Sequence, residues 1–474
     1  MQDSATLTRC ASEGPSLAHR VSVAESATFI QDWSRGFCLL GVAQAWQSAG
    51  RGDLAVSEAV EVIVVGGGVI GCAVAYELAA RSVPVLLIDH SLPGRATSAS
   101  AGGLWPIGEA VGLGCGVIYH AAQAHPKPAS THEATWQTAI TTEEQGPLPL
   151  PDVFRDFLVR SNSMFPDLAA ELREQSGVDI EYAPGTGLLF VIHDEPERHF
   201  VERVARSLPP QVRLEMLSAE EAVRVEPNLA RDLLGGALLT GEGQVNPMML
   251  AEAFKRAAIR RGAGIRHHAR VTSLRCHGGR IAGVDIGPEF VPCQTVVNAA
   301  GAWASELAAT AGLKLPVTPV RGQIVLTETL PPTLNGCLST STCYLAQKAH
   351  GEVLIGSTTE YAGFDVSVTP EAIRSLCRGA ARVVPLLGRV QVKRTWAGLR
   401  PGTPDELPIL GKMNGVDGYV NATGGFRTGI VASPLTGKVV AQVVCGQEPC
   451  FPIAPYSADR FRGATATREG AGLG

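Results

Sequence analysis

The residues best suited to bind a charged ligand begin with a glycine pattern near the start of the folded sequence. Gly66, Gly68 and Gly71 have the spacing G-x-G-x-x-G. The first glycine permits a tight turn, the second lets backbone N–H groups approach a pyrophosphate, and the third lets a helix pack closely on a strand. Asp89 follows at the distance from which an acid can bind a ribose hydroxyl. These residues predict a dinucleotide-binding site.

The flanking sequence supplies the elements that such a site needs. Residues 62–65 are an apolar run without alternation, as a strand buried on both faces requires. From 62 to 89 the sequence indicates a strand, a glycine turn, a helix, a second strand and a terminal acid, which is a βαβ unit. The positive end of the helix would face the phosphates, and we expect Val69 and Ile70, at its start, to contact the ligand.

A loop of small residues comes after this unit. Residues 93–105 are mainly small before the final tryptophan, so their backbone could pass close to a flat ligand. An ordinary glycine-rich loop is the alternative.

Arg400 is the first candidate for substrate binding. It lies in Thr-Trp-Ala-Gly-Leu-Arg-Pro-Gly-Thr-Pro-Asp-Glu (395–406), where a rigid backbone framed by glycine and proline could point the guanidinium into a cavity. The planar fork of donors would bind a carboxylate in a bidentate manner. The alternative is a surface arginine paired with Asp405 or Glu406.

A second glycine turn occupies residues 421–430, before a helix at 434–444. The N–H groups and the dipole at the start of that helix could stabilise negative charge on a reduced flavin. A plain strand-to-helix turn is the alternative. Arg427 lies inside the turn and Tyr344 on a predicted strand, so both could point at the cavity of Arg400; a core or edge tyrosine is the alternative.

Composition excludes several classes of protein. The chain has 474 residues, a net charge of −5 and 18% charged residues without a basic stripe, so nucleic acid is not expected as a partner. Its eleven cysteines form no C-x-x-C pair and match neither a zinc site nor a common iron–sulfur spacing. We therefore expect no metal, reduced thiols in a cytosolic protein, and any further redox centre on another chain.

Histidine is also informative. All eleven histidines lie at or before His350, outside the C-terminal motifs. Hydride transfer from a deprotonated amine to a flavin needs no obligatory protein base, so this distribution favours such chemistry.

The rest of the chain reads as an α/β protein. No apolar run is long enough to cross a bilayer, so membrane contact would be peripheral. Between 316 and 395 short β segments predict an antiparallel sheet that forms one wall of a substrate site. Residues 1–59 lack both the strand and helix pattern of the later residues and a signal-peptide motif. They are interpreted as an N-terminal extension, either disordered or the product of a misassigned start.

The combination of motifs resembles the glycine oxidase and D-amino acid oxidase family of FAD-dependent oxidoreductases. The resemblance covers about 60–462 and rests on the turn at 66–71, on Asn-Ala-Ala-Gly-Ala-Trp (298–303), and on the two C-terminal motifs. Residues 100–118 and 355–360 are most similar to the cyanide-forming branch, the C subunits of hydrogen cyanide synthases.

The resemblance implies an α/β architecture with a Rossmann-like FAD-binding domain and an inserted α+β substrate domain built on an antiparallel sheet. The FAD-binding parts would be about 60–110, 210–305 and 396–462, the substrate-domain parts about 111–209 and 306–395, and 463–474 a C-terminal tail. Arg400 would bind the substrate carboxylate, assisted by Tyr344 and Arg427. FAD, expected to be non-covalent, would contact Gly66, Gly68, Val69, Ile70, Gly71, Asp89, Ser100, Ala101, Gly102, Gly103, Leu104, Val271, Ala300, Gly301, Gly424, Gly425, Phe426, Thr428 and Gly429.

The implied activity is oxidation of glycine through an imine to hydrogen cyanide and carbon dioxide. Electrons would pass to the respiratory chain through companion subunits of a heterotrimeric complex, one carrying an iron–sulfur cluster, on the cytoplasmic side of the cell membrane or in the cytoplasm. The alternatives are the B subunit of an octopine or nopaline oxidase, a stand-alone glycine or D-amino acid oxidase or dehydrogenase, and a non-catalytic flavoprotein scaffold.

Overall fold

The structure is a computed structural model in which residues 60–114 and 150–461 are described. The predicted N-terminal extension (1–59), part of the segment 100–118 and the predicted tail (463–474) lie outside these ranges. The described residues belong to one compact unit that begins at Ala59.

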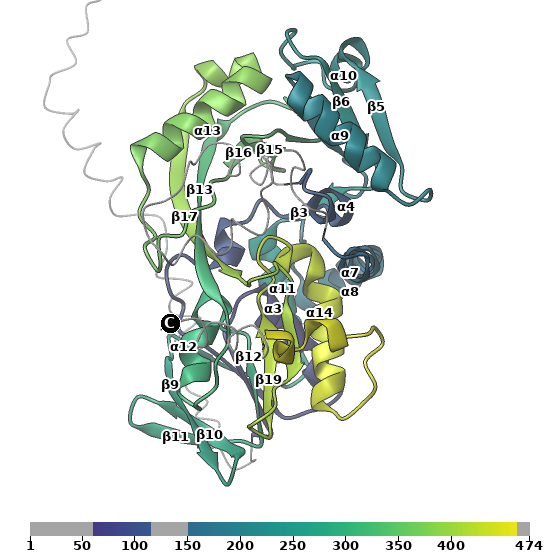
Figure 1. The fold of residues 1–474 in the computed structure, drawn as a ribbon. Coiled ribbons are helices and arrows are strands. Elements are labelled where there is room, and N and C mark those ends of the chain that lie inside the picture. Colours follow the sequence, from purple (N-terminus) through teal and green to yellow (C-terminus); the bar gives the residue numbers. More distant parts are fainter. Residues whose placement is uncertain (1–59, 115–149, 462–474) are drawn as a thin grey trace, which may run out of the picture. The chain divides into compact units, whose positions relative to one another are not determined.

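A six-stranded sheet contains the predicted βαβ unit (Figure 1). Its strands lie in the order β18 (Ile409–Lys412), β19 (Tyr419–Thr423), β12 (Thr295–Asn298), β1 (Val62–Val65), β2 (Val85–Asp89) and β8 (Gly264–His267). All neighbouring strands are parallel except β18, which is antiparallel to β19. The helix α3 (Val69–Ala79) connects β1 to β2, which confirms the predicted unit.

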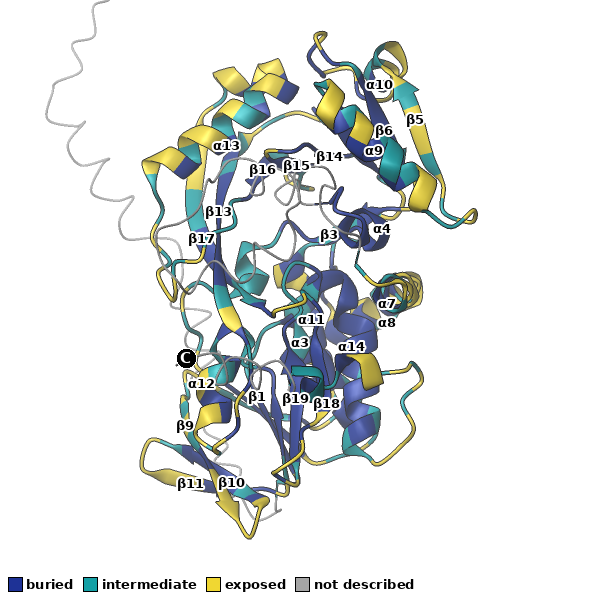
Figure 2. Ribbon diagram, in the orientation of Figure 1, coloured by how far each residue is buried: buried dark blue, intermediate teal, exposed yellow. Residues whose placement is uncertain are grey.

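Both faces of this sheet are covered, which explains the unbroken apolar run in β1. Val62 and Val64 pack with α3, α11 (Pro247–Arg260) and α14 (Gly429–Val444). Ile63 and Val65 face the other way, toward α12 (Ala304–Ala309) and a three-stranded antiparallel sheet. That sheet consists of β9 (Val271–His277), β10 (Arg280–Ile286) and β11 (Glu289–Pro292). Figure 2 shows β1 as buried, and most residues of α3 and α14 are buried as well.

A second, eight-stranded sheet forms the other half of the described unit (Figure 1). Its strands lie in the order β17 (Val392–Gly402), β13 (Thr318–Thr329), β16 (Glu352–Gly356), β15 (Tyr344–Gln347), β14 (Cys337–Ser339), β4 (Leu188–Ile192), β6 (Gly235–Leu239) and β5 (Leu214–Ser218). All neighbours are antiparallel except β14 and β4, which run parallel. The antiparallel sheet predicted between 316 and 395 is therefore present.

Alternate residues of this sheet enter two different cores. Tyr344 of β15 packs with Trp105 and α9 (Glu195–Ser207). Leu345, its neighbour, packs on α13 (Pro370–Val383), which covers the other face. Successive side chains of a strand point to opposite faces, so the register places Tyr344 on the face opposite α13.

The remaining elements are short or peripheral. Two of them are helices, α7 (Asp152–Asn162) and α8 (Phe165–Ser176), and Pro166 lies in the first turn of α8, where proline is tolerated. The others are η1 (Ala96–Ala99), β3 (Gly103–Leu104), α4 (Pro106–Ala110), α10 (Ala219–Val225), β7 (Gly243–Gln244), η2 (Gly301–Trp303), η3 (Pro385–Arg389), η4 (Ala454–Tyr456) and η5 (Ala458–Phe461). Among the described helices, none combines the length and the apolar character needed to cross a membrane.

Two segments pack with a different large sheet from the one predicted for them. The strands β5 and β6 belong to the eight-stranded sheet, although 210–305 was predicted to be FAD-binding. The helices α7 and α8 pack with the core of the six-stranded sheet, although 111–209 was predicted to be substrate domain. Both sets of bounds followed from the family resemblance, which does not fix the sheet against which each element of this chain is buried.

Candidate active site

One cavity of about 390 Å³ is lined by residues from both large sheets. It lies at the carboxyl ends of β1, β2, β12 and β19, which parallel pairing brings to one edge, where ligands of open α/β sheets bind. The opposite wall comes from β13, β15 and β17. The predicted residues that line this cavity are Gly66, Gly68, Val69, Ile70, Asp89, Ser100, Ala101, Gly103, Val271, Ala300, Gly301, Tyr344, Arg400, Gly425, Phe426, Arg427 and Gly429.

The other predicted residues lie behind the wall rather than in it. They are Gly71, Gly102, Leu104, Gly424 and Thr428. A Cβ atom on Gly71 would lie 1.8 Å from the carbonyl oxygen of Gly66, and one on Gly102 would lie 2.0 Å from that of Val245. Each of these glycines therefore allows its backbone to approach another backbone segment closely. They can contribute to cofactor binding only by shaping the cavity wall.

The first glycine turn joins β1 to α3 at one end of the cavity. Gly66 has φ +112, and a Cβ there would lie 2.3 Å from the oxygen of Ala299, so only glycine fits. Gly68 is the N-cap of α3, and the backbone from Gly66 to Ile70 lines the cavity. A helix N-terminus at this position offers N–H groups and a positive dipole to an anion.

Asp89 lies beside this turn with several donors around it. Its carboxylate accepts hydrogen bonds from the Gly67 N–H at 3.1 Å, the Ser91 hydroxyl at 3.0 Å and Arg95 at 2.9 Å. A carboxylate has about four acceptor positions, so roughly one remains for a ligand hydroxyl. Thr97 is a further contact, because its Oγ1 accepts the Val69 N–H at 3.0 Å. Arg95 and Thr97 were not singled out, although both lie in the small-residue loop.

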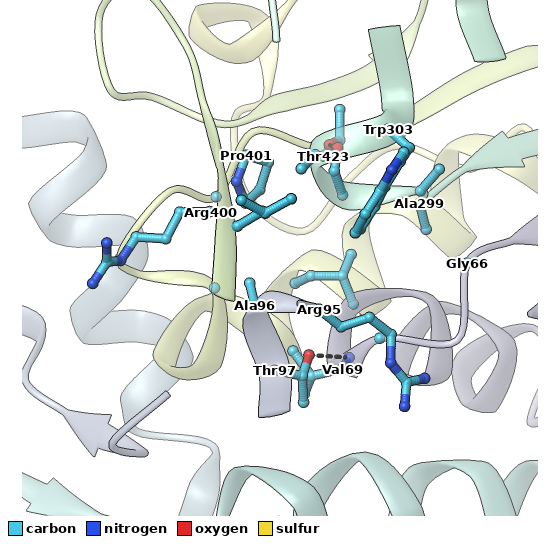
Figure 3. Close-up of a pocket in the computed structure, with 18 of the residues that line it drawn as sticks. Gly66, Val69, Arg95, Ala96, Thr97, Ala299, Trp303, Arg400, Pro401 and Thr423 are labelled. Atoms are coloured by element: carbon cyan, nitrogen blue, oxygen red, sulfur yellow. Dashed lines mark hydrogen bonds between the residues drawn. The ribbon is translucent and has the colours of Figure 1, made fainter. Parts of the chain in front are cut away.

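Small residues line the middle of the cavity, among them Ala96 and Ala299 (Figure 3). A Cβ on Gly398 would lie 2.3 Å from the Cβ of Ala99, so the two chains approach as closely as glycine permits. Trp303 forms another part of the wall, and its ring stacks on that of Phe364 with centroids 5.7 Å apart. Small side chains along this part of the wall leave room for a flat ring system.

Arg400 lies at the end of the cavity opposite the glycine turn. Its guanidinium points away from Arg95 and Trp303 in Figure 3 and donates to the Ser357 hydroxyl and, at 3.1 Å, to the carbonyl of Thr358. A Cβ on Gly322 would lie 2.3 Å from that guanidinium. Glycine in β13 therefore makes room for Arg400, which the sequence pattern did not indicate.

The surface ion pair considered for Arg400 does not form. Asp405 pairs with Arg460 at 2.7 Å, and Glu406 pairs with Arg427 at 2.9 Å. Among residues 60–114 and 150–461, no carboxylate lies within ion-pair distance of Arg400. Its charge therefore remains available to a bound carboxylate.

Tyr344 is close to the same place. A Cβ on Gly356 would lie 2.3 Å from the phenolic oxygen, and the next residue, Ser357, binds Arg400. The Tyr344 ring is buried and meets Trp105 edge-on, with centroids 5.6 Å apart. The fold thus brings the predicted tyrosine and the predicted arginine together.

Arg427 has a different environment from the one expected of a carboxylate-binding residue. Its side chain is 4% exposed and lies between two acids, Glu406 at 2.9 Å and Glu109 at 3.8 Å. Glu109 lies on α4 and also lines the cavity. Glu109 is distant from Arg427 in the sequence, and Glu406 lies in a turn whose direction the sequence pattern did not reveal.

The second glycine turn packs against the strand that carries Arg400. Gly424 has φ +77, and Phe426, with φ 39, donates its N–H to the Pro401 oxygen at 3.1 Å. α14 begins at Gly429, and this residue lines the cavity. The positive end of a 16-residue helix therefore faces the ligand space, as negative charge on a reduced flavin would require.

Two buried ionisable residues support the neighbouring walls. Glu242 accepts the N–H groups of Ile107 and Gly108 at 3.1 and 3.3 Å, and burial raises its pKa well above the usual range of a carboxyl group. The Lys348 ammonium donates to the Ala101 carbonyl, and burial lowers its pKa. They hold α4 and the small-residue loop in position.

Metal and thiol chemistry find no support in the described part of the chain. No group of three or more histidine, cysteine or acidic residues there could hold a metal ion. None of the residues that line the cavity is a cysteine. Non-covalent attachment of FAD remains a prediction.

Comparison with known proteins gives a consistent result. The family model of the FAD dependent oxidoreductases matches residues 61–443. Hydrogen cyanide synthase subunit HcnC of Pseudomonas protegens is 45% identical over 416 residues, which cover 86% of this chain and 98% of that protein. The crystal structure of glycine oxidase from Geobacillus kaustophilus has a TM-score of 0.70 at 31% identity, covering 84% and 98% of the two chains. The structure of iminodiacetate oxidase from Chelativorans has a TM-score of 0.67 at 27% identity, covering 84% and 98%.

Proposed function

Because the chain belongs to the family of FAD-dependent oxidoreductases and acts on amino acids, we propose that it oxidises glycine as the catalytic subunit of a hydrogen cyanide synthase. The proposal is supported by 45% identity to HcnC over nearly the whole length of that protein. The single observation that carries it is one cavity with a glycine-turn cradle at one end and Arg400 beside Tyr344 at the other.

The residues of the cavity fit FAD in three respects. The N-terminus of α3 suits the pyrophosphate, and Asp89 suits a ribose hydroxyl. The small residues that line the middle of the cavity, such as Ala96 and Ala299, leave room for a flat ring. Bound there, FAD would accept the electrons removed from the substrate.

The protein's own residues would place the substrate. Arg400 would bind its carboxylate in a bidentate manner, and the Tyr344 hydroxyl would add a hydrogen bond. Trp105 and the neighbouring apolar residues exclude water from this end, which strengthens both contacts. Fixing the carboxylate places the α-carbon of the substrate in a defined position relative to the middle of the cavity.

The overall reaction balances as two successive oxidations of two electrons each. The first converts the C–N single bond of glycine to a C=N bond and releases two electrons and two protons. The second breaks the C–C bond, and the imine becomes hydrogen cyanide and carbon dioxide with release of two further electrons and two protons. The four electrons need an acceptor, which we assign to companion subunits, one with an iron–sulfur cluster, and through them to the respiratory chain. Peripheral association with the membrane would follow from that complex.

The second candidate is a stand-alone glycine oxidase, favoured by the similarity to the Geobacillus kaustophilus enzyme. The B subunit of an opine oxidase is a third. The three differ in the product, the electron acceptor and the substrate.

The deciding experiment is anaerobic mixing of the FAD-loaded protein, co-expressed with its neighbouring subunits, with glycine and then with octopine. The flavin absorbance band and trapped cyanide would be followed. Bleaching by glycine with release of cyanide is expected. Bleaching by glycine without cyanide would support the stand-alone oxidase, bleaching by octopine alone would move the chain to the opine oxidases, and no bleaching would favour a scaffold.

A further inference from the structure

Two arginines lie close together at the substrate end of the cavity. Pro401 and Phe426 are joined by a backbone hydrogen bond of 3.1 Å, and Arg400 and Arg427 each lie one residue from it. Both arginines line the cavity. A substrate with two carboxylates could in principle be bound by both.

The two arginines differ in their ionic partners. Arg400 has hydrogen bonds to Ser357 and Thr358, and no carboxylate of the described residues pairs with it. Arg427 is flanked by Glu406 and Glu109, so the group of three has a formal charge of −1. Among the described residues, the substrate end therefore presents one arginine without an acidic partner and a second arginine that pairs with two acids.

We propose that Glu109 and Glu406, by neutralising Arg427, restrict the substrate to small amino acids with a single carboxylate. The inference rests on the proposed function and deepens it. A second carboxylate would meet a site of net negative charge and would have to displace Glu406 or Glu109 from the guanidinium, whereas a substrate ammonium group is attracted by the same charge. Glycine fits this requirement, and iminodiacetate and the opines do not.

Acetate and glutarate serve as unreactive probes of this selectivity. Glutarate has the chain length of iminodiacetate, with a methylene in place of the nitrogen. Their dissociation constants would be measured by calorimetry on the FAD-loaded wild type, Glu406→Gln, Glu109→Gln and the double variant. The formal charge of the cluster rises from −1 to 0 to +1 along this series. We expect glutarate to bind about tenfold more tightly at each step, while acetate changes much less.

Asp405→Asn is the matched control. Asp405 precedes Glu406 in the same turn, but it pairs with Arg460 and not with Arg427. A general disturbance of the turn would alter both probes in this variant as well. The ratio of the glutarate and acetate dissociation constants should stay at its wild-type value.

Turnover provides the second readout. The ratio of kcat/KM for iminodiacetate to that for glycine should rise by about tenfold in Glu406→Gln, mainly through a lower KM for iminodiacetate. A purely structural role of the acids would lower both values together. An unchanged ratio in both the binding and the turnover experiments would overturn the inference.

Failure of the inference and failure of the proposed function are distinguishable. If Arg400→Lys loses acetate binding, the assigned substrate end is supported. This conclusion does not depend on the result for glutarate. If acetate binds and Arg400→Lys leaves its affinity unchanged, the proposed function loses its carboxylate site. If the acetate affinity depends on Arg400 but the glutarate affinity is the same in the Glu406 and Glu109 variants as in the wild type, only the role of the two acids is refuted.

Discussion

At the nucleotide end of the cavity a ligand would meet mainly backbone, and at the substrate end it would meet side chains. The turn from Gly66 to Ile70 comes from one continuous segment, and Gly66 is fixed by its close approach to the Ala299 backbone. Arg400, Tyr344, Glu109 and Arg427 come from four separate segments. Binding at the first end therefore depends on the local path of the chain, and at the second end on how distant elements pack.

The two ends also differ in charge. The nucleotide end combines a helix N-terminus with one acid, Asp89, which is compensated by Arg95. The substrate end places an arginine without an acidic partner among the described residues beside an arginine held by two acids. We infer that cofactor affinity depends on the first arrangement and that choice among substrates depends on the second.

The largest effect is expected at the nucleotide end. A Cβ on Gly71 would lie 1.8 Å from the Gly66 oxygen, so Gly71→Val should separate α3 from β1. We expect loss of bound FAD and a decrease in the free energy of unfolding of about 3 kcal/mol or more. Flavin absorbance and urea unfolding measure the two effects. Gly241→Ala is the control, because a Cβ there has no neighbour within 4 Å; FAD retained in Gly71→Val would refute the packing argument.

The next effect tests the substrate end alone. Arg400→Lys keeps the charge but removes the planar fork, so kcat/KM for glycine should fall by about 30-fold to 1,000-fold, or about 2–4 kcal/mol. Bound FAD should be retained. Arg394→Lys, on the same strand β17 but outside the cavity, is the control. Equal losses in the two variants would mean that the strand rather than the guanidinium is responsible.

A smaller effect concerns pH and the support of α4, the helix that carries Glu109. Burial raises the folded-state pKa of Glu242, so the folded protein holds this proton at pH values where the unfolded chain releases it. Stability should therefore fall as pH rises from the ordinary carboxyl pKa of 4.5 toward the raised value, by about 1.4 kcal/mol for each pH unit.

Glu242→Gln should abolish this contribution. The amide oxygen can still accept the Ile107 and Gly108 N–H groups, so the variant should gain stability over the wild type as pH rises through this window. Melting temperatures between pH 5 and pH 8 would show it. Parallel curves for the two proteins would contradict a raised folded-state pKa.

The smallest effect returns to the nucleotide end. The Arg95 side chain is 33% exposed and pairs with Asp89 at 2.9 Å, so Arg95→Gln should raise the dissociation constant of FAD by less than about fivefold, and less at high salt. Fluorescence titration of the apoprotein would measure it. Arg81→Gln, which breaks an ion pair with Glu77 in α3, should have no effect. A loss larger than tenfold would mean that the nucleotide end depends on side chains as much as the substrate end does.

The sequence could predict the nucleotide end because its residues are neighbours along the chain. The strand, turn, helix and acid between 62 and 89 follow from apolar runs and glycine spacing, and the structure confirms the elements. The small-residue loop and the second turn were also predicted to approach a ligand, and residues of both line the cavity. Tyr344 and Arg400 were singled out through motif context and through the resemblance to a family.

The rest depends on contacts that no local pattern encodes. Glu109 on α4 meets Arg427 more than 300 positions later, and Gly322 on β13 leaves space for Arg400 on the neighbouring strand β17. In the same way, no local pattern shows that β5 and β6 belong to the eight-stranded sheet. Which carboxylate compensates which arginine is a property of the packed structure.

The position of β1 in the middle of its sheet has a consequence for synthesis of the protein on the ribosome. Val62–Val65 pair with β2 nearby, but β12 on their other side begins at Thr295, and β19 begins only at Tyr419. At about 5–20 residues per second, on the order of half a minute separates the emergence of β2 from that of β19. During that interval the glycine turn exists without the walls that enclose it. A nascent chain of this protein would therefore acquire its cofactor late, and its apolar strands would need protection from aggregation until then.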